Sequence, residues 1–293
     1  MENAAGRRKE KDMKKIRIYP YTEKMISPRS AFMEARRNFA RSYPSSAFEC
    51  VERVFEDFND LFEGKYHGYR RCNTIYHDKT HTTDTLLAMS RLIDGYNGSE
   101  RKELPFEEVR IAFIAALFHD AGFIQKSTDR RGTGGKYTLT HVARSITFMK
   151  KYFSERRFAR RDFVSARNIV QCTGVRASVR SIKFSGKTEK ILGFMLGTAD
   201  LLSQMAAPDY LAKLPHLYRE FREGRVPGYR SEEDLLKKTP AFYEETKTKL
   251  KTDFRGVSKY SRAYFAKRHG MAMDVYTECI ERHMEHIKEA LRK

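Results

Sequence analysis

Two histidines and an aspartate stand close together in the segment Tyr76–Asp84, which reads YHDKTHTTD. His77 and His81 are four residues apart and Asp84 is three residues beyond His81, so a helix would bring all three to one face. Imidazole is a common metal ligand, and a carboxylate behind it can fix its orientation. A helix start with surface histidines is an equal alternative for this stretch taken alone.

A histidine and an aspartate are adjacent at the end of the apolar segment Ile111–Gly122, IAFIAALFHDAG. Burying His119 and Asp120 costs about several kcal/mol unless they are paired or bind a cation. Neighbouring helical residues point about 100° apart. One ion can still take both side chains if it lies at the helix end, where Gly122 lets the backbone turn away. For the dipeptide alone, a hydrogen-bonded core pair is the default interpretation.

A third candidate, Asp200, lies in the apolar segment of residues 191–204, ILGFMLGTADLLSQ. A buried aspartate needs a cation or several donors, and a helix cap or an arginine pair is the alternative. In chain order the three segments supply His, His-Asp and Asp, each on its own helix. Two imidazoles and two carboxylates suit zinc, manganese, iron or magnesium. Side chains converging from different helices of a bundle commonly build such a site.

The elements that must position these residues are helices. Apolar residues recur at helical spacing from Ala47, and further helices are expected over residues 82–96, 105–119, 139–154, 161–172, 188–205 and 208–223. Ser231 with Asp234 predicts another helix start, Pro240 is expected to break or kink that helix, and the last helix starts near Met271. No stretch alternates with period two, so the sequence predicts an all-α protein.

The length of 293 residues allows one large helical domain or a core with a small appendage. Residues 1–46, interrupted by prolines, are expected to form a basic extended or loosely docked arm. Residues 47–228 would form the metal-site domain, and residues 229–293 a C-terminal helical extension packed on it. No apolar run approaches the roughly 20 residues of a membrane helix. The four cysteines form no CxxC pair, which favours reduced thiols and a cytoplasmic protein with no membrane partner.

The formal net charge of +19 favours anionic partners, either phosphate esters or nucleic acid. The charge is spread along the chain, which favours a solvated surface and leaves nucleic-acid binding open. The basic, glycine-rich segment Lys126–Lys136 lacks the Ser or Thr and the preceding strand of a Walker A loop. As a mobile lid it could hold substrate phosphate through Lys126, Arg130, Arg131 or Lys136, and an ordinary exposed loop is the equal alternative.

Taken in order, these motifs resemble those of the HD superfamily of metal-dependent phosphohydrolases. Over residues 66–225 they are most similar to cyclic-nucleotide phosphodiesterases and their bacterial relatives, whose first motif is YHNxxHxxD. Tyr76–Asp84 matches that motif, His119-Asp120 matches the HD dyad, and Asp200 matches the last aspartate. His141 with Ser145 is similar to the HxxxS segment of bacterial members, and Cys172-Thr173 to their threonine position.

The resemblance implies a multi-helix HD-domain bundle in which four residues bind a divalent ion: His81, His119, Asp120 and Asp200. Such an ion supplies hydroxide near neutral pH and polarises a phosphoryl oxygen. Asp120 or Asp200 could orient the attacking water. The resemblance leaves His77 off the metal, and His77 is then the candidate acid that protonates the leaving alkoxide. Thr173 and His141 are expected near the substrate, and His141 could instead assist a second ion or have a structural role.

The chain also departs from the phosphodiesterase pattern. Asp78 replaces the motif asparagine, Ala121-Gly122-Phe123-Ile124 replaces the continuation xxHPG, and no glutamine matches the one that grips a purine. A cyclic nucleotide and a second metal are therefore in question. We expect metal-dependent hydrolysis of a nucleotide phosphodiester or monoester. The alternatives are another HD enzyme, such as a deoxynucleotide triphosphatase or a guanosine tetraphosphate hydrolase, a non-catalytic nucleotide- or nucleic-acid-binding signalling module, and a basic nucleic-acid-binding protein with a vestigial site. The oligomeric state is left open.

Overall fold

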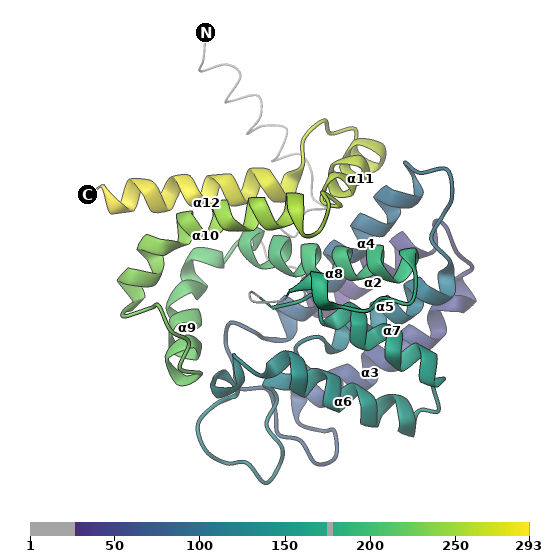
Figure 1. Cartoon of the computed structure of the whole chain (residues 1–293), viewed down its shortest axis with the longest axis horizontal. Helices are drawn as coiled ribbons and strands as arrows, with labels where there is room; N and C mark the ends of the chain where they lie inside the picture. The colour runs from purple at the N-terminus through teal and green to yellow at the C-terminus, as the bar shows by residue number, and fades with distance from the viewer. Residues whose placement is uncertain (1–26, 175–177, 293) are drawn as a thin grey trace.

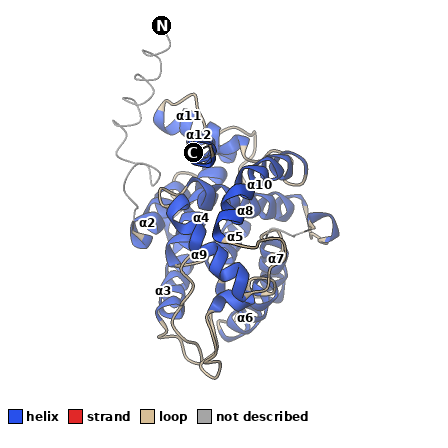
Figure 2. Cartoon of the chain, turned by 90° about the vertical axis from the view of Figure 1, so that its left-hand side faces the viewer, coloured by secondary structure: helices blue, strands red, loops and turns tan. Residues whose placement is uncertain are grey.

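The structure, a computed structural model of the chain, describes residues 27–174 and 178–292. In these two ranges the chain forms eleven α-helices and four short 3-10 helices, and no β-strand (Figure 2). One isolated antiparallel bridge pairs Tyr69 with Lys126 in this part of the chain. The all-α prediction is confirmed.

The helices follow the order of the apolar segments in the sequence. Their bounds are α2 (Pro28–Phe39), α3 (Glu49–Glu63), α4 (Lys79–Asn97), α5 (Phe106–Phe118), α6 (His141–Glu155), α7 (Arg160–Val170), α8 (Lys187–Ala206), α9 (Tyr210–Glu223), α10 (Glu232–Thr252), α11 (Lys259–His269) and α12 (Val275–Leu291). The 3-10 helices are η1 (Ser45–Phe48), η2 (Ala121–Phe123), η3 (Gly134–Tyr137) and η4 (Val179–Ser181).

The centre of the bundle is built from α4, α5 and α8. All side chains of residues 81–95 in α4 are buried, and α5 is apolar around nearly its whole circumference. A helix that is buried on every side must be surrounded by other elements. Accordingly α2, α8 and α11 pack on α4, and α7 packs on both α5 and α8 (Figure 1). These three central helices carry the candidate metal ligands.

The extended arm that we expected before Ala47 is wrong for residues 28–39, which form α2. Ser27 caps this helix through its hydroxyl, and Pro28 suits its first turn. Phe32 stacks on Phe55 of α3 with ring centroids 3.8 Å apart. The prolines that predicted an arm do not interrupt this helix, because Pro28 lies at its start and Pro44 lies beyond its end. Residues 1–26 of the expected arm lie outside the described residues.

The chain after Gly228 continues the same bundle, since α12 packs on α8 and α11 on α4. The helix start at Ser231 is confirmed, because its hydroxyl accepts a hydrogen bond from the Asp234 N–H at 3.0 Å. The helix α10 is not broken at Pro240. The helix α12 begins after Asp274, which caps it, and therefore later than we expected. The domain boundary at residue 228 stays a prediction, but one buried core extends across it.

The described helices were also compared with the length and hydropathy that a bilayer requires. None of them is both long and apolar enough to cross a membrane. This finding agrees with the absence of a long apolar run in the sequence.

Candidate metal centre

His81 is placed by the start of α4. The carboxylate of Asp78 caps the helix and accepts a hydrogen bond from the His81 N–H at 2.8 Å. His81 therefore lies in the first helical turn, with a buried side chain. His77 precedes the cap, so the predicted helical face that joins His77, His81 and Asp84 is wrong. The two imidazoles are nevertheless close, with ring centroids 5.8 Å apart.

His119 and Asp120 lie where α5 ends. The His119 Nδ1–H donates to the carbonyl oxygen of Ala116 at 2.8 Å, so its Nε2 carries the lone pair in the neutral ring. Asp120 then leaves helical geometry, with φ −105° and ψ 7°. This change of direction lets two adjacent side chains face the same point. The prediction that both could serve one site at the helix end agrees with this geometry.

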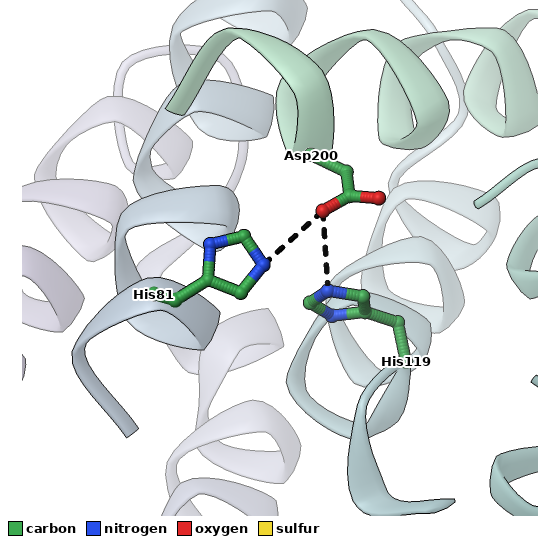
Figure 3. Close-up of side chains that lie close together, drawn as sticks. All are labelled: His81, His119 and Asp200. Carbon is green, nitrogen blue, oxygen red and sulfur yellow. Dashed lines mark ion pairs between the residues drawn. The ribbon is translucent and has the colours of Figure 1, made fainter. Parts of the chain in front are cut away.

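Asp200 enters from the middle of α8 and faces both histidines (Figure 3). Its Oδ1 lies 3.2 Å from His81 Nε2 and 3.6 Å from His119 Nε2. The ligand atoms of these three buried residues all lie within 4.8 Å of one another. This His-His-Asp group could hold a metal ion.

Asp120 borders the same group from the end of α5. Its Oδ2 lies 3.5 Å from His81 Nε2 and 3.4 Å from His119 Nε2. These three atoms are buried, and none has a hydrogen-bond partner among the described residues. Three unsatisfied polar atoms that face one another would destabilise a core. Nitrogen and oxygen donors of this kind fit a divalent cation, which would satisfy all of them together.

The electrostatics of the group follow from its burial. Burial alone would lower the pKa of His119, but the carboxylates of Asp120 and Asp200 outweigh it and raise that pKa to about 9. Burial opposes ionisation of Asp200, yet the two histidines hold its pKa well below the ordinary range. The pKa of Asp120 is lowered in the same way. Without a cation, the carboxylates therefore favour the protonated imidazole of His119.

His77 is held from behind by Glu220 of α9, a residue that the sequence analysis did not identify. The His77 Nδ1–H donates to Glu220 Oε2 at 2.6 Å, and Glu220 Oε1 accepts the N–H groups of Ile75 and Tyr76 at 3.0 and 2.8 Å. Burial lowers the pKa of His77, and the Glu220 carboxylate, with smaller contributions from Asp120 and Asp200, raises it above the ordinary value overall.

The sequence held only a weak signal for Glu220. In the helix that contains it, the apolar residues at helical spacing predict a buried core face: Leu211, Leu214, Tyr218 and Phe221. Glu220 belongs to the same helix, but its side chain is only 5% exposed. A charged residue beside an apolar stripe usually lies at its solvated edge, so the sequence pattern does not predict this burial. Its partner His77 is 143 residues away along the chain.

His141 lies at the start of α6 and faces Asp120. Its Nδ1–H donates to the carbonyl oxygen of Thr138 at 2.7 Å, and its Nε2 lies 3.8 Å from Asp120 Oδ1. Burial lowers the pKa of His141, although Asp120 opposes this effect. The ring of Phe123 stacks on both His77 and His141, with centroids 4.3 and 4.5 Å away. His141 is thus brought to the site, and its lowered pKa favours the neutral imidazole.

Ser145 and Gly122 join α6 to the end of α5. The Ser145 hydroxyl donates to the His119 carbonyl oxygen at 2.6 Å and accepts from the Gly122 N–H at 2.8 Å. A Cβ at Gly122 would lie 1.9 Å from the His141 carbonyl oxygen. We had assigned this glycine to a backbone turn, but its φ is not in the left-handed region. Glycine is required here because the start of α6 approaches the backbone so closely.

Thr173 and Asp84 occupy different sides of the group. Thr173 lines the cavity beside it, and its hydroxyl donates to the Val170 carbonyl oxygen at 2.8 Å. Asp84 is buried and forms no hydrogen bond with a histidine of the described chain; its Oδ1 has no partner there. Burial, with the charge of Asp78, raises the Asp84 pKa to about 8. A small cavity of about 20 Å³ borders both Asp84 and His81, so an outer role for Asp84 stays a prediction.

The basic loop before α6 is not brought to the site. Lys136 pairs with Asp129 at 2.7 Å, and Lys126, Arg130 and Arg131 are exposed. None of the four lines the cavity beside the candidate ligands. Their contact with a substrate phosphate therefore stays a prediction, which this geometry does not support.

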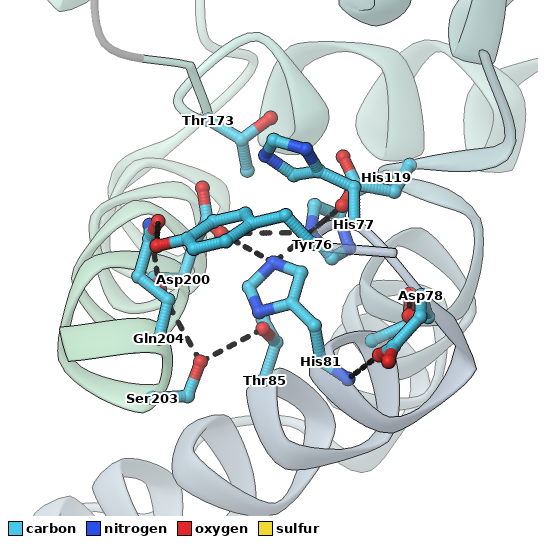
Figure 4. A network of polar contacts seen from close by, with 12 residues as sticks. Tyr76, His77, Asp78, His81, Thr85, His119, Thr173, Asp200, Ser203 and Gln204 are labelled. Atoms are coloured by element: carbon cyan, nitrogen blue, oxygen red, sulfur yellow. Dashed lines mark hydrogen bonds and ion pairs between the residues drawn. The ribbon is translucent and has the colours of Figure 1, made fainter. Parts of the chain in front are cut away.

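A polar network supports the candidate ligand on α8 (Figure 4). The Tyr76 hydroxyl donates to Gln204 Oε1 at 3.0 Å, and Gln204 Nε2 donates to the Asp200 carbonyl oxygen at 3.1 Å. Ser203 also donates to that carbonyl oxygen at 3.2 Å and contacts the Thr85 hydroxyl of α4 at 3.0 Å. These contacts fix α8 against α4, so the network positions the side chains of both helices.

A cavity of about 400 Å³ opens beside the group. His77, Asp120, His141, Thr173 and Asp200 lie in its wall. The remainder of the wall comes mainly from α9, α10 and the turn between them. This volume is within the range of about 300–1,000 Å³ that is typical of small-molecule sites. Two of the candidate ligands, Asp120 and Asp200, are therefore reachable by an organic molecule.

The chain was compared with known proteins. No curated protein and no solved structure matches it. One family model, described as Npun_R2479-like, matches residues 66–254. This segment begins before His77 and extends through α10, so it contains every residue of the candidate metal centre and the wall of the cavity. Because the match covers more than half of the 293 residues, the chain belongs to the Npun_R2479-like family.

Proposed function

We propose that this protein is a metal-dependent phosphohydrolase of the HD type that hydrolyses a phosphate ester. The observation that carries the proposal is the set of buried, unsatisfied atoms His81 Nε2, His119 Nε2 and Asp120 Oδ2, with Asp200 Oδ1 within 3.6 Å of both imidazoles. In this proposal all four residues bind one divalent cation. The ordered resemblance of the same residues to HD motifs supports the assignment.

The surrounding residues suit hydrolysis at a phosphorus atom. A bound divalent cation supplies an activated water and polarises a phosphoryl oxygen. His77 lines the cavity and is held by Glu220, whose carboxylate favours the protonated imidazole. His77 would therefore carry the proton that the leaving oxygen needs, and Glu220 would fix the ring orientation. General acid catalysis of this kind contributes about 10²–10⁴-fold to the rate.

His141 would contact the substrate or a second ion. Its Nε2 faces Asp120 Oδ1 across 3.8 Å, and its Nδ1–H is already used by Thr138. The neutral ring therefore presents a lone pair toward the cavity, which can bind a cation or accept a hydrogen bond. The lowered pKa of His141 favours this neutral form. His141 and Asp120 would hold such a second ion, since the Asp120 carboxylate faces both His119 and His141.

The test is metal content together with hydrolysis of a panel of phosphomonoesters and phosphodiesters, including nucleotides. Wild type, Asp200→Asn, His77→Asn and the distant control Asp57→Asn would be compared. We expect stoichiometric metal and turnover in wild type and the control, loss of both in Asp200→Asn, and retained metal without turnover in His77→Asn.

Each other outcome has a defined meaning. Loss of metal in His77→Asn would make His77 a ligand and refute its role as the acid. Metal without turnover of any ester would favour a binding module over an enzyme. If wild type binds no divalent cation under any loading condition, the group is a structural polar cluster and the proposal is wrong.

A further inference from the structure

The cavity beside the metal centre has an apolar outer half. It begins at Asp120, Asp200 and His141 and extends between α9 and α10. Its outer wall consists of apolar and aromatic side chains from these helices and the turn that joins them: Leu214, Leu217, Phe221, Val226, Pro227, Leu235 and Phe242. One end of the cavity is therefore suited to a phosphoryl group, and the other end to an apolar group.

Few lysine or arginine side chains line the described part of the cavity wall, although the chain has a net charge of +19. Lys238 is the one lysine or arginine among the described residues of its wall. The Lys238 ammonium already donates to the Gly228 carbonyl oxygen at 2.7 Å and to Asp234 Oδ2 at 2.8 Å. Sites for polyphosphates usually present several free arginine or lysine side chains. This wall therefore disfavours a di- or triphosphate.

The hydroxyl and amide groups of the wall are also largely committed within the protein. Thr239 donates to the Leu235 carbonyl oxygen at 2.9 Å, and Thr138 donates to the Gly135 carbonyl oxygen at 2.6 Å. Gln204 uses its oxygen for Tyr76 and its nitrogen for the Asp200 carbonyl. A substrate group in this half would thus gain more from apolar burial than from new hydrogen bonds.

We propose, on the basis of the function proposed above, that the substrate is a monophosphate ester of a bulky apolar alcohol or phenol. The phosphoryl group lies at the metal centre, and the organic group fills the cavity between α9 and α10. In the reaction the water oxygen bonds to phosphorus and the ester P–O bond breaks. The bonding pair stays on the ester oxygen, which takes a proton from His77, and the products are the free alcohol or phenol and inorganic phosphate.

The first experiment compares four substrates with the cation-loaded full-length protein: methyl phosphate, benzyl phosphate, 1-naphthylmethyl phosphate (the naphthyl ester) and inorganic triphosphate. The three esters release alcohols of similar acidity, so their leaving groups are matched. We expect kcat/KM to rise by about tenfold or more from the methyl to the naphthyl ester, because each added apolar group is removed from water. Triphosphate should be the poorest substrate. Equal kcat/KM values along the series, or a preference for triphosphate, would overturn the inference and leave the proposed hydrolysis intact.

The second experiment changes the apolar wall. Phe242 in α10 is half-buried and lines the cavity, whereas Phe106 is 37% exposed, begins α5 and does not line it. In Phe242→Glu we expect the naphthyl-to-methyl ratio of kcat/KM to fall by about tenfold, and in Phe106→Glu to stay as in wild type. Phe242→Ala gives the same comparison if Phe242→Glu is unfolded by circular dichroism. An unchanged ratio in a folded Phe242 variant would overturn the inference.

A binding measurement separates this inference from the proposed function. 1-Naphthylphosphonate and methylphosphonate cannot be hydrolysed at phosphorus, so calorimetry with the cation-loaded protein reports binding alone. Tighter binding of the naphthyl compound, lost in Phe242→Glu, would support the cavity assignment even if no ester is turned over. Equal binding of the two phosphonates would overturn it, whether or not hydrolysis is found.

Discussion

The stability of the metal-free protein should fall as the pH rises from about 6.5 to about 9. The cause is His119, whose pKa is raised from 6.5 to about 9, since the Asp120 and Asp200 carboxylates outweigh the opposite effect of burial. A group with a raised pKa in the folded state stabilises that state fully below its unfolded pKa. The contribution is lost as the pH rises through the folded pKa, because the folded protein must then release the proton.

The difference between 6.5 and about 9 sets the size of the effect. At about 1.4 kcal/mol for each pH unit, it corresponds to about 3 kcal/mol as an upper bound. The lowered pKa of Asp200 reflects the same attraction between His119 and Asp200, so its free energy is not added to that of His119. The carboxylate contribution would be lost only as the pH falls through the acid range, where Asp200 takes up its proton. It does not vary between pH 6.5 and 9.

Urea unfolding of wild type and His119→Asn in the presence of a chelator would measure this effect. Other groups titrate in the same range, including Asp84, whose pKa is raised to about 8 by burial. Because they are present in both proteins, the difference in the free energy of unfolding isolates His119. We expect this difference to shrink between pH 6.5 and 9, by at most about 3 kcal/mol.

A divalent cation should reverse the sign of the pH dependence. Metal ligands must be deprotonated, so the stabilisation that the cation adds grows as the pH rises over the same range. A constant difference between wild type and His119→Asn in chelator would refute the charge pairing inferred from the 3.4 and 3.6 Å contacts of His119. A cation-induced stabilisation that His119→Asn retains in full would refute its role as a ligand.

Three other changes test the residues around the metal centre. Glu220→Gln keeps an acceptor for the backbone N–H groups but removes the charge that raises the His77 pKa. The high-pH limb of the kcat/KM profile should therefore move to lower pH, and kcat/KM should fall by about 10–100-fold. The buried control Glu189→Gln should leave the pH profile unchanged. Gly122→Ala should destabilise the protein by about 3 kcal/mol in thermal unfolding, because its Cβ would overlap the backbone of α6. Asp84→Asn should stabilise the protein by about 1–3 kcal/mol at pH 8 and by much less at pH 4.5, because burial penalises the Asp84 charge and raises its pKa. A gain in unfolding free energy that does not change with pH would refute this cause.

The helices that carry the candidate ligands could be predicted because their apolar pattern is strong. The bounds of α5 and α8 differ little from the expected ranges, as a nearly continuous apolar run leaves few alternatives. The helices α2 and α11 were missed. Both are short, and α11 has charged residues on most of its circumference, so local propensity gave little signal. Their stability comes from packing on α4, which a local pattern does not contain.

The candidate ligands could be predicted for a different reason. His119, Asp120 and Asp200 stand in apolar segments where an unpaired polar side chain is costly, so their presence needed an explanation. His77 was assigned to the correct neighbourhood, but the helical face that would join it to His81 requires a helix through Asp78. The carboxylate of Asp78 instead ends the loop and starts α4. Short polar residues such as Asp78 are favoured as helix caps, so the sequence allows a helix that starts after Asp78 as well as one that includes it.

The residues that depend on long-range contacts were out of reach. Glu220 acts on His77 across the fold, and Gly122 is required by the approach of α6 rather than by a turn. The cavity depends most on long-range contacts, because its outer wall lies in α9, α10 and their connecting turn. Our expected boundary at residue 228 separated these elements, whereas the family match continues to residue 254 and includes them. The part of the chain that we treated as an extension therefore provides part of the surface that would select the substrate, and changes in α10 should alter specificity before they alter metal binding.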